Sequence, residues 1–133
     1  MAIQITPSQL KVYRGTARNR EAALKIEIEA RRQRAWIIAQ QAAVILKEEF
    51  GVSRVAVFGS LLQPDRFHFR SDIDLAVWDI HDYFRAVARL MDLDSEIEFD
   101  LVPIEDASPR IMAVINDEGL DLRMSKLLDG TLR

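Results

Sequence analysis

The amino-acid sequence predicts an α+β domain in which helices cover one side of a small sheet. One short apolar run, 55–58, and two alternating runs, 72–78 and 97–104, have the character of strands, and segments with helical spacing stand between and around them. The chain has 133 residues, of which 49% are hydrophobic and 29% charged. This length suits one domain that buries roughly two-thirds of the surface of its unfolded chain.

The first predicted element is a long helix that ends at Gly51. No Gly or Pro occurs between positions 17 and 50, and apolar residues recur there at steps of three and four: Trp36, Ala39, Ala43, Leu46 and Phe50. Glycine directly after a helix accepts the left-handed backbone that ends it. Because apolar residues are sparse in the first half of this helix, we expect residues 1–34 to form a projecting arm and 35–133 to form the domain.

The arm and the domain differ in charge. Residues 1–34 hold eight Lys or Arg and three Glu, a balance of +5, so the remainder carries −8 within a net charge of −3. A basic helix is typical of nucleic-acid binding or of a solvated face. The acidic stretch 92–100 would repel nucleic acid, so we do not expect nucleic acid as a main partner. Docking of the arm to an acidic protein is expected instead.

Several classes of protein are disfavoured by composition. The chain has no cysteine, which excludes disulfides and thiolate metal sites. Its first residues lack the basic and then apolar order of a signal peptide, and no apolar stretch reaches the roughly 18 residues of a membrane span. A cytoplasmic protein without a membrane anchor is therefore expected.

The remaining elements follow in order along the chain. The apolar run 55–58 predicts a strand that ends at Gly59, residues 61–71 are irregular, and 72–78 alternates as a strand does. Residues 83–91 have helical spacing, and 97–104 alternates again. Ser108 and Pro109 are typical of a helix start, and Gly119 is typical of its end.

Three aspartates lie on the two alternating strands. Asp72 and Asp74 project from one face, about 7 Å apart by the usual rise of a strand, and Asp100 lies in the middle of the third strand. Neighbouring carboxylates repel one another and lose hydration on burial, so a cation among them or protonation is required. Carboxylate ligands without His or Cys favour Mg²⁺, which also accepts phosphate oxygens. His68 and His81 are isolated and are not expected to bind a metal ion.

Gly59 and Ser60 form a turn directly after the first strand. Glycine lets the backbone approach a phosphate closely, and the exposed N–H groups of a turn together with a serine hydroxyl bind phosphate oxygens. A Gly-Ser turn is weak evidence alone. Its combination with two acidic strands indicates nucleotide chemistry.

The whole pattern resembles a known family. Gly59-Ser60, ten residues, SDIDLAV and then EFDLV are similar to the motifs of the polymerase-β-like nucleotidyltransferase superfamily, over about residues 35–115. Within the superfamily, the pattern resembles in particular the minimal prokaryotic (MNT) members, the antitoxins of HEPN/MNT toxin–antitoxin pairs. The resemblance implies a short mixed sheet with helices on one face. It also implies that Asp72 and Asp74 bind two Mg²⁺ ions, that Asp100 is a third carboxylate and the general base, and that Gly59 and Ser60 hold the phosphates of ATP.

The implied function is transfer of AMP from ATP to a hydroxyl, a tyrosine of a cognate HEPN ribonuclease toxin, which silences the toxin. Two alternatives remain open: a non-catalytic antitoxin that neutralises its partner by contact, and a nucleotidyltransferase that modifies a small molecule. One departure from the family pattern is the segment LLQPDR after the turn, where Leu61 and Leu62 replace small or basic residues. Arg66 or Arg70 could supply the missing charge, although both have the character of solvent-facing residues.

Overall fold

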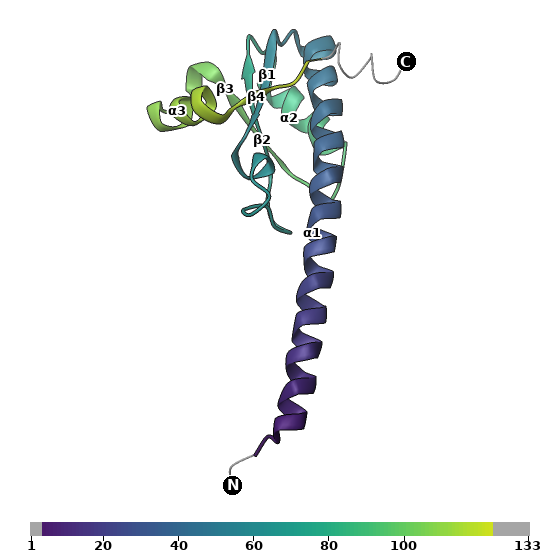
Figure 1. Cartoon of the computed structure of the whole chain (residues 1–133). Coiled ribbons are helices and arrows are strands. Elements are labelled where there is room, and N and C mark those ends of the chain that lie inside the picture. The colour runs from purple at the N-terminus through teal and green to yellow at the C-terminus, as the bar shows by residue number, and fades with distance from the viewer. Residues whose placement is uncertain (1–3, 124–133) are drawn as a thin grey trace.

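The computed structural model describes residues 4–123, so the last ten residues of the predicted domain lie outside the described residues. It has a small sheet with three helices, one of which extends far beyond the body (Figure 1). The predicted α+β class is confirmed. Across residues 4–123, no helix combines the length and the apolarity that a membrane span requires.

The sheet has four strands in the order β3-β2-β1-β4. Their bounds are Arg54–Phe58 for β1, Ile73–Trp78 for β2, Phe99–Pro103 for β3 and Leu120–Asp121 for β4. β1 pairs antiparallel with β2 and with β4, whereas β2 and β3 run parallel. The sheet is therefore mixed, as the resemblance implied.

Within residues 4–123, three α-helices accompany the sheet: α1 (Pro7–Phe50), α2 (Tyr83–Met91) and α3 (Pro109–Glu118). α1 begins with a capping box at Thr6 and ends at Gly51, whose φ of 68° is left-handed, as the sequence predicts. α3 begins at Ser108, whose side chain accepts a hydrogen bond from the backbone N–H of Ile111. Its predicted start and its end before Gly119 are both observed.

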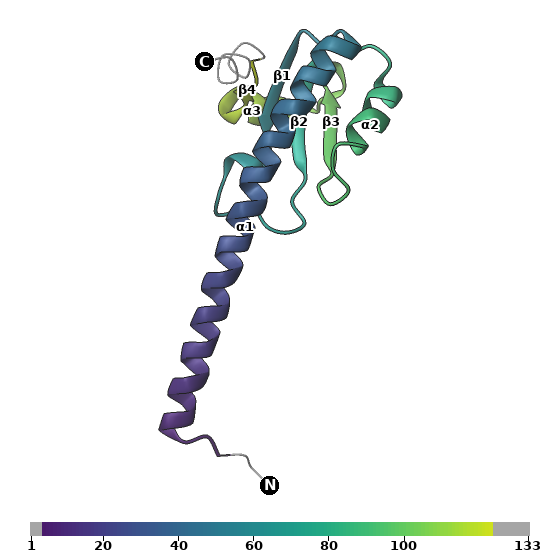
Figure 2. The same cartoon turned by 90° about the vertical axis from the view of Figure 1, so that its right-hand side faces the viewer.

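The helices lie on both faces of the sheet. α1 and α2 pack with Val55 and Val57 of β1 in the larger core, while Ile115 of α3 packs with Ala56 and Phe58 on the opposite face (Figure 2). The expectation of helices on one face is thus correct for α1 and α2 and wrong for α3. The physical reason is that successive residues of β1 point to opposite faces and nearly all are apolar, so both faces need cover.

Two of the differences from the predicted elements concern the strands β3 and β4. The third strand begins at Phe99 and not at residue 97, because Asp94 accepts hydrogen bonds from the backbone N–H groups of Glu96 and Ile97 and holds a turn there. The two-residue strand β4 was not predicted. It is too short to show a period in the sequence, and its pairing with β1 depends on tertiary structure.

Candidate functional site

The candidate site lies at the end of the sheet from which the first half of α1 projects. β1 ends there, and β2 and β3 both begin there, so the chain brings together the turn after β1 and the first residues of two parallel strands (Figure 1). Phe58 at the end of β1 pairs with Asp74, and Asp74 in turn pairs with Asp100. Gly59 and Asp100 are 41 positions apart in the sequence, yet both lie at this edge of the sheet.

Gly59 is required by its backbone and by its neighbour. Its φ is 81°, a left-handed value that side chains disfavour, and a Cβ at this position would collide with Oδ2 of Asp74. Gly59 opens a single turn of 3-10 helix, Gly59–Leu62, in which Ser60 is half-buried and Leu61 is buried. The absence of a side chain thus lets the turn contact the Asp74 carboxylate directly.

Asp74 is the electrostatic centre of the site. It is half-buried on the face of β2 that also carries Ala76, and it lies beside Asp100 of the parallel strand. Burial raises the pKa of its carboxyl to about 6, and the negative charges of Asp100 and Asp72 contribute. These three predicted site residues therefore act on one another, as the alternation of the two strands predicted.

Asp72 has two further neighbours that the sequence analysis did not identify. It is exposed and lies just before β2. Loss of hydration is the largest cause that raises the pKa of its carboxyl, and the negative charges of Glu98 and Asp100 raise it further. Arg31 of α1 opposes this rise. Glu98 could have been found from its spacing of two residues before Asp100. No sequence signal connects Arg31 with Asp72, because they meet only through the packing of α1.

The segment between the turn and β2 is held by buried side chains and local hydrogen bonds. Phe67 is buried, and the Oγ of Ser71 accepts a hydrogen bond of 2.9 Å from the backbone N–H of His68. Arg66 and Arg70 are exposed, in agreement with their solvent-facing character. The turn after β1 is instead contacted by α1, through a hydrogen bond of 3.0 Å from Nε of Arg32 to the carbonyl oxygen of Leu61.

The carboxylates fit Mg²⁺ by chemistry and charge. Oxygen ligands without His or Cys suit this cation, and a bound cation would offset both the burial of the Asp74 carboxylate and its repulsion by Asp100 and Asp72. In residues 4–123, no group of three or more His, Cys, Asp or Glu side chains is arranged to hold a metal ion. Assignment of Asp72, Asp74 and Asp100 as metal ligands therefore rests on donor chemistry and electrostatics.

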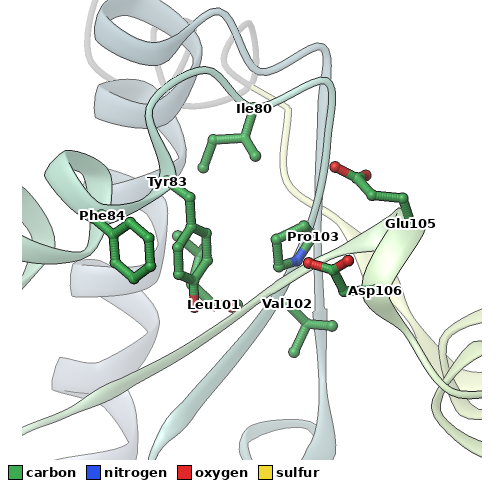
Figure 3. Close-up of a pocket in the computed structure, with 8 residues that line it drawn as sticks. All are labelled: Ile80, Tyr83, Phe84, Leu101, Val102, Pro103, Glu105 and Asp106. Carbon is green, nitrogen blue, oxygen red and sulfur yellow. Dashed lines mark hydrogen bonds between the residues drawn. The ribbon is translucent and has the colours of Figure 1, made fainter.

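A cavity of about 520 Å³ lies away from these carboxylates, between α2 and the far end of β3 (Figure 3). Phe84 and Pro103 line it, and Tyr83 beside them donates a hydrogen bond from its hydroxyl to the carbonyl oxygen of Leu101. Glu105 and Asp106 are its acidic residues. None of the predicted site residues contributes to this cavity, so it is not part of the candidate site.

Comparison with known proteins identifies the domain. The family model described as "Polymerase beta, Nucleotidyltransferase" matches residues 40–123, which include the turn and all three aspartates. No curated protein matches the chain significantly.

Solved structures show the same fold. A toxin–antitoxin structure with AMP-PNP is 21% identical, with a TM-score of 0.52 over 69% of this chain and 78% of that one. A mutant MntA toxin–antitoxin complex, in which two aspartates one residue apart are changed to glutamate, is 19% identical, with a TM-score of 0.53 over 70% and 78%. A tri-AMPylated Shewanella oneidensis HEPN toxin in complex with MNT antitoxin is 17% identical, with a TM-score of 0.51 over 73% and 78%.

Proposed function

Since the chain belongs to the polymerase beta nucleotidyltransferase family, we propose that it is a Mg²⁺-dependent protein adenylyltransferase that acts as an antitoxin. It transfers AMP from ATP to a hydroxyl of a HEPN ribonuclease toxin, a tyrosine by resemblance, and thereby neutralises the toxin. The similar structures support this proposal because they include an ATP analogue and an AMPylated toxin held by an MNT antitoxin.

The contact between the Gly59 turn and Asp74 is the observation that carries the proposal. It places a turn suited to phosphate oxygens directly against a carboxylate suited to Mg²⁺, and the two groups belong to adjacent strands. A nucleoside triphosphate bound with Mg²⁺ needs both partners within a few ångströms. A turn followed by a solvated strand would not be expected to bury a carboxylate against a glycine if the two bound no ligand.

Each site residue then has a defined task. Asp72, Asp74 and Asp100 would hold Mg²⁺, which would supply charge neutralisation for an in-line displacement at the α-phosphorus. Gly59 and Ser60 hold the phosphates through backbone N–H groups and the serine hydroxyl. Asp100 is the second residue of the edge strand β3, where it would take the proton of the attacking hydroxyl. The leaving group is pyrophosphate.

The test measures whether a labelled phosphate of ATP is transferred to the HEPN protein. The purified chain is incubated with Mg²⁺, a cognate HEPN protein, and ATP labelled at either the α- or the γ-phosphate. We expect label on the HEPN protein from α-labelled ATP alone, and loss of ribonuclease activity that requires ATP. The Asp74→Asn variant serves as the inactive control.

Two results would contradict the proposal. Neutralisation of the ribonuclease without ATP and without label would indicate a non-catalytic antitoxin. Label transferred equally well by Asp74→Asn would exclude the carboxylate site as the catalytic centre.

A further inference from the structure

The N-terminal half of α1 carries an apolar stripe that continues the core-facing stripe of the same helix. At about 100° per residue, Leu10, Leu24 and Ile28 lie within about 40° of one another, on the side from which α1 packs on the sheet. Leu10 and Leu24 are 40% and 43% exposed, whereas Ile28 is half-buried against the core. Ala17 and Tyr13 lie on the same side, and Glu21 is a charged residue that interrupts the stripe between Ala17 and Leu24. Beyond the body, this stripe has no cover among the described residues.

Basic side chains border this stripe. Arg14, Arg18 and Lys25 are exposed along one side of it, and they contribute to the balance of +5 in residues 1–34. Only three glutamates occur in that segment. An apolar strip beside a row of cations fits a protein surface with apolar residues and an acidic border.

The direction of the projecting helix relates it to the candidate site. α1 passes the end of the sheet where β1 ends and where β2 and β3 begin, and it continues in the same direction well beyond that end (Figures 1 and 2). A protein seated on the apolar stripe therefore lies next to the edge that carries Asp72, Asp74 and Asp100.

Three arginines fasten the base of the projecting helix to the segments that form this edge. Arg32 donates to the carbonyl oxygen of Leu61 at 3.0 Å, and Arg31 donates to the carbonyl oxygen of Glu96 at 2.7 Å. Arg34 forms an ion pair of 2.5 Å with Asp94, whose side chain is almost fully buried. One turn of α1 is thus tied both to the turn after β1 and to the segment before β3, which fixes the direction of the helix relative to the site.

We propose that the arm, residues 7–34 of α1, is the docking element that seats an acidic protein acceptor at the carboxylate edge of the sheet. The inference rests on the proposed function, because the acceptor is the protein whose hydroxyl receives the nucleotide. It adds a binding surface that lies outside the family-matched residues 40–123. The apolar stripe provides affinity, and the basic border provides attraction at long range.

The test compares the two faces of the same helix in the full-length chain. The stripe variant is Leu10→Gln with Leu24→Gln, and its matched control is Val12→Gln with Ile26→Gln on the opposite face. The control residues are more exposed, at 64% and 71%, and glutamine keeps a high helix propensity in both variants. Affinity for the cognate HEPN protein is measured by calorimetry, together with binding of ATP and Mg²⁺ to each variant.

A second pair of variants tests the basic border. Arg14→Glu with Arg18→Glu reverses two charges on the arm, and Arg85→Glu with Arg110→Glu makes the same change of charge on exposed positions of the body. Affinities are measured at low and at high salt.

We expect the stripe variant to lose about tenfold or more in affinity for the HEPN protein, the scale of removing central interface side chains. The control of the opposite face should bind as the wild type does. The arm charge variant should bind more weakly at low salt and lose most of its salt dependence, while the body charge variant keeps both. Binding of ATP and Mg²⁺ should be equal in all variants.

Distinct outcomes overturn the two proposals. If the wild type does not bind the HEPN protein at all, the proposed function is wrong and the docking role falls with it. If the wild type binds and modifies that protein but the stripe variant does so equally well, only the docking role is wrong. A wild-type dimer that the stripe variant dissociates, with unchanged affinity for the HEPN protein, would show that the stripe holds a second copy of the chain instead.

Discussion

Replacing Asp74 by asparagine should stabilise the metal-free fold while removing transfer activity. Its carboxyl is half-buried beside two other acids, and its pKa is raised from 3.8 to about 6. A raised carboxyl pKa means that the folded state binds a proton more tightly than the unfolded state does. At neutral pH, where both states are ionised, this difference is a cost to folding. The asparagine side chain would be neutral at every pH and would keep the shape of the aspartate that it replaces.

The magnitude follows from the shift in pKa. A rise from 3.8 to about 6 corresponds to about 3 kcal/mol of destabilisation at pH 7 if the group were fully buried. Because Asp74 is only half-buried, solvent screening reduces the figure, and we expect a gain of about 1.5 kcal/mol for Asp74→Asn. The gain should decrease as pH falls through 6 toward 4, because the folded wild-type carboxyl then becomes protonated.

The assay is urea unfolding of both proteins with EDTA at a series of pH values, repeated with Mg²⁺ in place of EDTA. Mg²⁺ should stabilise the wild type more than the variant, because a ligand that binds only the folded state raises its stability. A variant that is less stable than the wild type at pH 7 in EDTA would refute the reasoning. A gain that does not change with pH would refute the role of ionisation.

Three further predictions concern the site, and a fourth concerns the arm. The double variant Asp72→Ala, Asp74→Ala should lose at least about a hundredfold in Mg²⁺-supported transfer and still fold, as followed by turnover and circular dichroism; full activity would exclude the carboxylate site. Asp100→Asn keeps the shape but cannot accept a proton, so turnover should fall further than ATP affinity; equal losses in the two measurements would make Asp100 mainly a metal ligand. Gly59→Ala should destabilise the fold by about 1–3 kcal/mol in urea unfolding, because of its left-handed φ and the collision with Asp74. Gly15→Ala meets nothing within 4 Å and should strengthen the arm helix by about 1 kcal/mol, seen as higher helicity; a loss of helicity would show that Gly15 is needed.

Local patterns in the sequence were sufficient for most elements. The bounds of α2 are those predicted, and both ends of α3 follow from Ser108 and Gly119. These signals depend on groups within a few residues of one another, such as a serine side chain and the N–H three positions later. The same holds for the alternation that puts Asp74 of β2 and Asp72, the residue just before this strand, on one side. Their roles as metal ligands, and that of Asp100 as base, remain predictions.

The order and faces of the sheet were decided by contacts between distant segments. Nothing within β1 determines that α3 covers one of its faces, or that two residues after Gly119 add a fourth strand. The projecting helix is a similar case. Its basic charge is visible in the sequence, but its direction depends on Arg32 meeting the carbonyl oxygen of Leu61, 29 positions away.

Residue type and strand period are local properties, so the sequence is enough to indicate which residues have the chemistry of a nucleotide site. The folded chain is needed to see that Gly59 lies against Asp74, that Glu98 and Arg31 act on Asp72, and that α1 extends past that edge. The physical reason is that burial, the raised pKa of Asp74 and the docking direction all depend on distances between segments far apart in the chain. Those distances are set by the shared core under α1 and by the pairing of β1, β2 and β3.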